Sequence, residues 1–435
     1  MVAVLEWLNG VVWGIPTLFL FLGSGLWFSI QTCWIQFRRF GRSFRAIRDD
    51  LKSPQNGKST SVSTSAALLT SLAAVMGPGN LVGVSSAILS GGPGAVFWMW
   101  ISAFLGMATR YAESTLSVLH RRTGENGNYG GPMYVMRDSG NRRCAVVFAI
   151  AGVAISLTMA NALPSGAIGS ALYDAYGIPT ILTGAILSLF VLSAVTGGVK
   201  RICKVTGVLV PAVCILFLGA SLWITFTHPT LFMAAVKRIF SEAFSLRAGV
   251  GGLLGGAIRY GMARGIYSNE AGMGTDPILA ASTDERSAHR QGLISMAGPF
   301  LDTVVFCSMT AFVVVMADIS GADPSDAVTL AFTRFLPYSG RLIVILTMAL
   351  LVMATLAGWI CYGEACLQYL TNRRWIRSAY HAVYTLLPVF CAGAELGILF
   401  TLTDLCTALM AIPNVILCIK LLPEVKIELR NHDSL

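Results

Sequence analysis

The stretches Gly77-Pro78-Gly79-Asn80 and Asn269-Glu270-Ala271-Gly272-Met273-Gly274 interrupt two segments that otherwise have the composition of membrane-spanning helices. Glycine tolerates backbone conformations that other residues avoid, and proline removes a backbone donor, so both stretches are expected to break their helices. Irregular backbone at this depth is tolerated only where it is buried in protein or lines a cavity. Two such breaks in corresponding positions of two halves therefore indicate a site for a transported solute.

The composition around these breaks is that of a polytopic helical membrane protein. Of the 435 residues, 55% are hydrophobic and only 12% are charged, against roughly 25% charged residues in an ordinary soluble domain. No charged residue lies between Lys58 and Arg110, and this stretch must hold two spans because one span needs about 20 residues. The ten cysteines form no CxxC pair, which favours buried small hydrophobic residues over disulfides or a metal site.

The net charge of +9 is distributed in a pattern that argues against a nucleic-acid partner. Basic residues gather in alternate loops, such as the run from Arg38 to Lys58 and the group from Lys200 to Lys204, whereas most of the intervening loops are poor in charge. This is the positive-inside pattern of a multi-pass protein of the cell membrane. It predicts an N-terminus outside the cell and a cytoplasmic C-terminus.

Hydropathy predicts eleven spans, of which the second and the seventh contain the breaks. A further helix is expected over 229–247, on the outer face. The predicted spans cover residues 13–37, 65–90, 94–119, 144–172, 178–199, 205–226, 248–282, 292–317, 342–370, 378–399 and 405–422.

The spacing of the two broken spans predicts an inverted repeat. The seventh span follows the second at an offset of five, and an odd offset means that the two cross the membrane in opposite senses. This is the leucine-transporter architecture, with two five-helix repeats of inverted topology and here one extra leading helix. The predicted parts are the leading helix with its basic linker (1–58), the first repeat (59–247), the second repeat (248–422) and a cytoplasmic tail (423–435).

At the first break, Gly77 and Gly79 are expected to adopt unusual backbone angles. The helix that resumes near Asn80 presents free N–H groups and a positive dipole end, which suit a carboxylate. The carbonyl groups left over before the break suit a small cation or an ammonium group. The alternative is a glycine kink that serves helix packing alone, because small residues are common at membrane helix interfaces.

The second break carries Glu270, and a carboxylate inside a span usually faces a partner or a water-filled cavity. Glu270 is therefore a candidate for holding a cation or carrying a proton, with a purely structural pair to Arg264 as the alternative. Asp302, at mid-span beside Thr303, is a second candidate for coupling, or it caps broken backbone in the core.

The ninth span faces the first break in this architecture and supplies two further candidates. The hydroxyl of Thr355 is a candidate sodium ligand, although a threonine more commonly hydrogen-bonds to its own helix. Trp359 is expected either to line the solute pocket or simply to pack.

Charged residues near span ends are explained by snorkelling. The loop 124–132 lacks the lysine and hydroxyl residue of a phosphate loop, and nothing supports an enzyme, a cofactor or a resident metal. The snorkelling residues are Arg110, Glu113, Arg341 and Glu364.

Several longer motifs resemble the alanine or glycine:cation symporter family, and they extend over nearly the whole chain. They are residues 77–84, 91–100, 106–113, 130–134, 264–274, 291–292, 302–303, 362–364 and 410–414. The resemblance implies sodium-coupled uptake of a small neutral amino acid, with sodium bound between Gly77 and Thr355. The residues expected to contact the amino acid are Gly77, Gly79, Asn80, Asn161, Asn269, Gly272, Met273, Gly274, Thr275 and Trp359.

Three positions depart from the family pattern. Pro78 stands where the family usually has threonine, Ala66 where it usually has glutamine, and Pro164 replaces a glutamine that faces the substrate in the family. These departures are expected to alter selectivity rather than folding. Two alternatives stay open: a transporter coupled to protons through Glu270 or Asp302, and an amino-acid sensor that binds its ligand without moving it.

Overall fold

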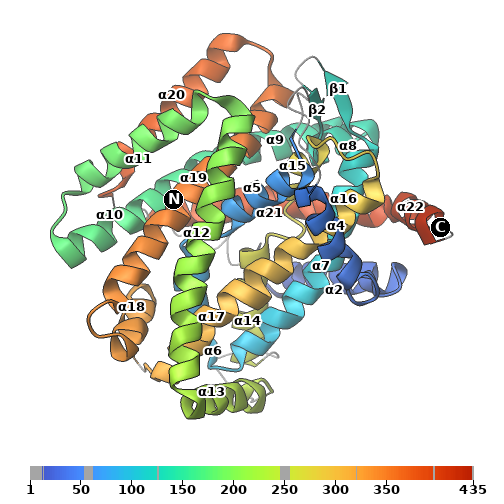
Figure 1. The fold of residues 1–435 in the computed structure, drawn as a ribbon. Helices are drawn as coiled ribbons and strands as arrows, with labels where there is room; N and C mark the ends of the chain where they lie inside the picture. The colour runs from blue at the N-terminus through green and yellow to red at the C-terminus, as the bar shows by residue number, and fades with distance from the viewer. Residues whose placement is uncertain are drawn as a thin grey trace.

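The computed structural model describes residues 12, 14–52, 62–124, 127–244, 255–319, 321–394 and 397–433. Within these ranges the protein is helical apart from one antiparallel pair of short strands (Figure 1). In chain order the elements are α2 (Ile15–Gln31), α3 (Ile35–Arg38), α4 (Phe40–Lys52), α5 (Thr64–Val75), α6 (Gly79–Gly91), α7 (Ala95–Leu119), β1 (Arg122–Gly124), β2 (Gly127–Tyr129), α8 (Pro132–Asp138), α9 (Arg142–Leu157), η1 (Thr158–Ala162), α10 (Leu163–Tyr176), α11 (Thr180–Val195), α12 (Gly198–Thr227), α13 (Pro229–Glu242), α14 (Gly256–Asn269), α15 (Asp276–Ala281), α16 (Ala288–Pro299), η2 (Phe300–Cys307), α17 (Ser308–Ala317), α18 (Pro324–Phe335), α19 (Gly340–Leu370), α20 (Arg374–Cys391), α21 (Gly397–Lys420) and α22 (Leu422–Asp433).

Several of these helices are suited to a lipid environment. Among the described residues, five helices are long and apolar enough to cross a membrane, and a sixth span results if the bent pair α5 and α6 is counted as one. The outer faces of α11 and α12 expose large apolar side chains, for example Leu189, Ile215 and Phe226, which are 68%, 77% and 78% exposed. Such faces are unfavourable in water and favourable in lipid. The chain is therefore a multi-pass helical membrane protein, while the full count of eleven spans stays a prediction.

The first predicted break is confirmed, but its cause differs from the expectation. Helices α5 and α6 meet at an angle of 49°. Neither Gly77 nor Gly79 has a positive φ angle, so the expectation of unusual glycine angles is wrong. The bend arises because Met76 is extended, with ψ of 95°, and Pro78 then starts the next helix without an N–H group.

The second break lies between α14 and α15 and does use left-handed backbone. Glu270 has φ of 49°, Gly272 of 93° and Gly274 of 83°. A side chain at Gly272 would also meet Phe21, because its Cβ would lie 2.7 Å from the ring atom Cε1. Glycine is therefore required at this position for two independent reasons.

Two spans contain π-helical segments that the sequence did not predict. The segment η1 links α9 and α10 and carries Asn161, and η2 links α16 and α17 and carries Asp302. A proline adjoins each segment, namely Pro164 and Pro299. π-Helical turns widen a helix locally and are frequent at functional sites.

Other differences from the prediction concern the ends of the chain and the loops. The first span does not continue to residue 37, because α2 ends at Gln31 and Cys33 and Trp34 have positive φ angles. Helices α4, α18 and α22 were not predicted. Cys33 and Cys144 are exposed rather than buried, and all ten cysteines are free. The predicted boundaries at residues 13, 58, 59, 247 and 248 lie outside the described residues.

Figure 1 shows how these elements are arranged. Helices α10, α11 and α20 lie on one side of the molecule, α22 projects on the opposite side, and α13 crosses one end. One large apolar core lies where α9, α11, α19 and α20 meet, and another lies where α5, α6, α12, α17 and α18 meet. Both broken helices are packed within the molecule, where the freed backbone groups find protein partners.

Candidate functional site

Helix α19 contacts the end of α5 at the first break. The hydroxyl of Thr355 lies 3.2 Å from the carbonyl oxygen of Met76 and 3.0 Å from that of Leu351 in its own helix. One turn further on, the indole nitrogen of Trp359 donates to the carbonyl oxygen of Ala74 at 3.1 Å. The structure thus places Thr355 and Trp359 against the carbonyl groups that precede the break. A Cβ at Gly77 would lie 3.2 Å from Thr355 Oγ1, so little room separates the two.

A buried carboxylate connects the two broken helices. Asp302 in η2 accepts hydrogen bonds from the amide nitrogen of Asn80 at the start of α6 and from Ser268 near the end of α14, the latter at 2.6 Å. Thr303 donates to the same carboxylate at 2.9 Å. Asp302 is fully buried and Asn80 is 1% exposed. Side chains from both breaks therefore converge on one negative charge.

The unwound segment of the second break is stabilised partly by its own side chains. Asn269 accepts a hydrogen bond from the backbone N–H of Ala271 at 3.0 Å and donates to Ser102 at 3.3 Å. The hydroxyl of Thr275 donates to Glu270 at 2.8 Å. Within the described part of the chain Arg264 forms no ion pair with Glu270, so the predicted structural pair is absent.

Two charged residues of α7 have a different environment from the one predicted. Arg110 and Glu113 are only 2% and 3% exposed, so the explanation that they snorkel from a span end is wrong. Arg110 donates to the carbonyl oxygen of Asn269 at 2.6 Å, and Glu113 accepts from the N–H of Gly272 at 3.2 Å. Asn414 of α21 donates to Glu113 and to the carbonyl oxygen of Gly272. These three residues hydrogen-bond to the unwound backbone of the second break. The sequence analysis did not include them among the candidate site residues.

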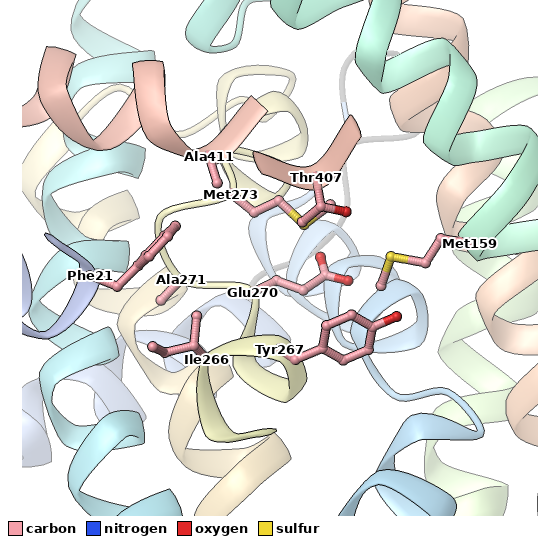
Figure 2. A pocket seen from close by; sticks show the side chains of 9 residues that line it. All are labelled: Phe21, Met159, Ile266, Tyr267, Glu270, Ala271, Met273, Thr407 and Ala411. Atoms are coloured by element: carbon pink, nitrogen blue, oxygen red, sulfur yellow. The ribbon is translucent and has the colours of Figure 1, made fainter. Parts of the chain in front are cut away.

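A cavity of about 290 Å³, including the part that is open to solvent, adjoins the second break. Figure 2 shows Glu270 and Tyr267 directed into it between Met159 and Thr407. The lining residues are Phe21, Met159, Ile266, Tyr267, Glu270, Ala271, Met273, Thr407 and Ala411.

The cavity includes only part of the predicted substrate set. Of the ten residues expected to contact the amino acid, Met273 alone lines it, together with the coupling candidate Glu270. The other nine do not, namely Gly77, Gly79, Asn80, Asn161, Asn269, Gly272, Gly274, Thr275 and Trp359. Tyr267 lies between the cavity and the first break, because a Cβ at Gly79 would lie 3.8 Å from its ring. The tyrosine ring thus lies close to the first break and also lines the cavity at the second.

Asn161 lies beside the cavity without lining it. Its amide nitrogen donates to the carbonyl oxygen of Tyr384 at 2.7 Å, while its buried amide oxygen has no hydrogen-bond partner. Met159, two residues earlier in η1, reaches the cavity wall. The buried Pro164 follows within the first turn of α10, so it is close to this region in the chain.

Comparisons with known proteins agree on the family and on the fold. A family model described as the sodium:alanine symporter family matches residues 1–434. The sodium/alanine symporter AgcS of Methanococcus maripaludis is 35% identical over 95% of this chain and 93% of that protein. The probable sodium/glutamine symporter GlnT of Bacillus subtilis is 32% identical over 94% of this chain and 86% of that protein.

One solved structure extends the comparison to architecture. A sodium-coupled sialic acid symporter in a substrate-bound outward-open state aligns with a TM-score of 0.53 and 12% identity, over 91% of this chain and 81% of that one. At this identity the likeness concerns the fold alone. It shows that the chain shares the overall helical fold of that protein.

Proposed function

Because the chain belongs to the sodium:alanine symporter family, we propose that it moves a small neutral amino acid, alanine or glycine first, into the cell together with sodium. The observation that carries this proposal is the convergence of Asn80 and Ser268 on the carboxylate of Asp302. It joins two broken helices through one buried charge, and paired broken helices are the usual location of substrate and ion sites in such transporters. The family consists of transporters, not enzymes.

We place the amino acid between the first break, at Gly77, Gly79 and Asn80, and the second break from Asn269 to Thr275. The positive dipole end of α6 suits its carboxylate, whereas the N–H groups of Asn80 and Leu81, which were expected to be free, already donate to the carbonyl oxygens of Gly77 and Pro78. The buried Glu270 carboxylate, directed into the adjoining cavity, suits its ammonium group. Asn161 and Trp359 complete the surroundings, and the apolar lining near Met273 favours an uncharged side chain.

Sodium is assigned to the carbonyl groups before the first break and to Thr355. Sodium is a hard cation that prefers oxygen ligands, and the Met76 carbonyl and the Thr355 hydroxyl supply two oxygens 3.2 Å apart. The remaining ligands would come from neighbouring carbonyl groups such as that of Gly77. Glu270 and Asp302 are the candidates for coupling, and Asp302 contributes the negative charge nearest to Asn80.

The packing of the helices supports an inverted repeat over 59–247 and 248–422. If α5–α6 corresponds to α14–α15, then α7, α9 and α11 correspond to α16, α19 and α20. Each of these corresponding pairs is in contact, which is the arrangement expected for elements that lie close to a pseudo-two-fold axis. We propose the N-terminus outside and the C-terminus in the cytoplasm of a cell-membrane protein, from the alternation of basic loops.

Uptake into proteoliposomes should depend on an inward sodium gradient. We expect at least tenfold faster uptake of labelled alanine or glycine in sodium than in choline medium, and further stimulation by an inside-negative potential. One charge moving inward gains about 2.3 kcal/mol per 100 mV before the sodium gradient is added. The measurement is initial uptake at fixed pH, with an imposed proton gradient as a separate condition. Equal uptake rates in sodium and choline would contradict sodium coupling. Faster uptake under the proton gradient would then favour Glu270 or Asp302 as proton carriers.

Thr355→Val should raise the sodium concentration needed for half-maximal uptake about fivefold, because it removes one oxygen ligand and keeps the shape, at a cost of about 1 kcal/mol. The apparent affinity for the amino acid at saturating sodium should change much less. The control is Thr333→Val, whose hydroxyl donates within its own helix to Thr329 at 2.7 Å. If only the affinity for the amino acid changed, Thr355 would not be a sodium ligand.

The same assay distinguishes the remaining alternatives. A sensor would bind amino acid but show no counterflow. The relative GlnT is named as a probable glutamine symporter. If this chain also carried glutamine, unlabelled glutamine would inhibit its uptake more strongly than unlabelled alanine does. If the protein accepts a wider range of amino acids than the family pattern implies, we attribute the difference to Ala66, Pro78 and Pro164. The variant Pro164→Gln tests this attribution.

A further inference from the structure

The unwound backbone between α14 and α15 receives its hydrogen bonds from other helices. Backbone groups inside a membrane protein need protein partners, because lipid offers none. The carbonyl oxygen of Asn269 accepts from Arg110, the N–H of Gly272 donates to Glu113, and the carbonyl oxygen of Gly272 accepts from Asn414 at 2.9 Å. Side chains of α7 and α21 thus replace the helical hydrogen bonds that the break has lost.

The α7 residues follow the break along one helical turn. Arg110 and Glu113 are three positions apart and therefore lie on the same face of the helix. Ser114, the next residue, donates to Asp276 at 2.9 Å, and the guanidinium of Arg110 lies 4.0 Å from the same carboxylate. Buried charges are costly unless they are paired and hydrogen-bonded, so packing alone would be served better by apolar residues.

Gly272 is held from two sides by residues that also hold each other. Glu113 of α7 binds its N–H, Asn414 of α21 binds its carbonyl oxygen, and Asn414 donates to Glu113 as well. Helix α21 also lines the cavity with Thr407 and Ala411. The conformation of the break is consequently linked to the relative position of α7 and α21.

We infer that Arg110, Glu113 and Asn414 are positioning residues of the transport site. They hold the second break so that Met273, next to Gly272, and Glu270, two residues before it, face the cavity. This inference rests on the proposed function for its role in uptake, whereas the contact itself has a separate test.

The test compares Glu113→Gln, Asn414→Asp and the double variant. Asn414→Asp places a second carboxylate against Glu113 and against the Gly272 carbonyl, and we expect uptake to fall at least tenfold with a raised KM for the amino acid. Adding Glu113→Gln provides an amide that donates to the new carboxylate and still accepts from Gly272. The double variant should therefore recover at least threefold over Asn414→Asp alone.

The matched control is Glu364→Gln, which changes a glutamate of α19 that lies 3.9 Å from Arg377 and 3.6 Å from His381. We expect its uptake to stay within twofold of the wild-type protein. Glu113→Gln should raise the KM at least threefold, because the break is mispositioned. A fall in maximal rate at unchanged KM, matching the loss of folded protein, would overturn the positioning role.

Hydrogen–deuterium exchange measures the stability of the break's backbone hydrogen bonds without a transport assay. The peptide covering residues 269–276 should exchange at least threefold faster in Glu113→Gln than in Glu364→Gln. If Asn414→Asp does not fold, this comparison together with the KM of Glu113→Gln decides the inference. Unchanged exchange would overturn it, whereas absent wild-type uptake with faster exchange would reject the proposed function and leave the positioning contact established.

Discussion

Asp302→Ala should reduce sodium-driven uptake at least a hundredfold while the protein still inserts in the membrane. The carboxylate accepts hydrogen bonds from Asn80, Ser268 and Thr303. Its removal leaves three buried donors without this acceptor, each at a cost of about 1–3 kcal/mol. Because about 1.4 kcal/mol corresponds to a factor of ten in rate, two such losses that act on the transport site account for the expected effect.

Two further variants show which property of Asp302 matters. Asp302→Asn retains an acceptor for Ser268 but removes the charge, so a cation site should lose sodium dependence more than it loses stability. Asp326→Ala, on the exposed side of α18, is the control for loss of an aspartate and should transport normally. Initial uptake at several sodium concentrations, with protein quantified in the vesicles, is the measurement. Near wild-type uptake by Asp302→Ala would exclude this residue from the site.

The second large effect is expected for Gly272→Ala. Its φ of 93° is unfavourable for alanine, and the new methyl group would lie 2.7 Å from Phe21 and 2.9 Å from Val415. Backbone strain of this kind costs about 1–3 kcal/mol, and overpacking adds about 1–3 kcal/mol. We therefore expect the melting temperature in detergent to fall by several degrees and uptake to be lost.

Gly298→Ala provides the matched control, because a Cβ at this position of α16 meets no atom within 4 Å. This variant should be neutral or slightly stabilising, since alanine is favoured over glycine in a helix by up to about 1 kcal/mol. Thermal unfolding and uptake are measured for both variants in parallel. If the two glycine variants behaved alike, the left-handed backbone at Gly272 would not be essential.

The breaks could be predicted because glycine and proline mark them directly in the sequence. Asp302 could be selected because charged residues inside a span are rare, and Thr355 because the ninth span faces the first break in the predicted architecture. Arg110 and Glu113 were misassigned because they lie within ten residues of the end of the span predicted over 94–119, which α7 matches, whereas their burial results from the packing of α7 against the second break. A stricter rule, under which every charged residue of a span is a candidate, would have included both.

Other features depend on contacts between helices that are distant in sequence. The π-helical segments carrying Asn161 and Asp302 differ from an α-helix by one residue per turn, and a single sequence gives no periodic signal for them. Glu270 has a positive φ angle that a glutamate alone would not favour. Asn414 acquires its role only when α21 packs beside the second break, so no local pattern identifies it.

The leading helix α2 gives the protein a built-in asymmetry. Phe21 reaches the cavity from a helix that lies outside both of the proposed repeats, and it packs with Ile266, Ala411 and Val415. Two repeats related by a two-fold axis would by themselves make the opposite access states nearly equal in energy. A helix that contacts the second break but lies outside both repeats removes this equality. If the proposed repeats hold, we expect substitutions at Phe21 to change the resting preference of the empty carrier for one side of the membrane, without any change in the residues proposed to bind the solute.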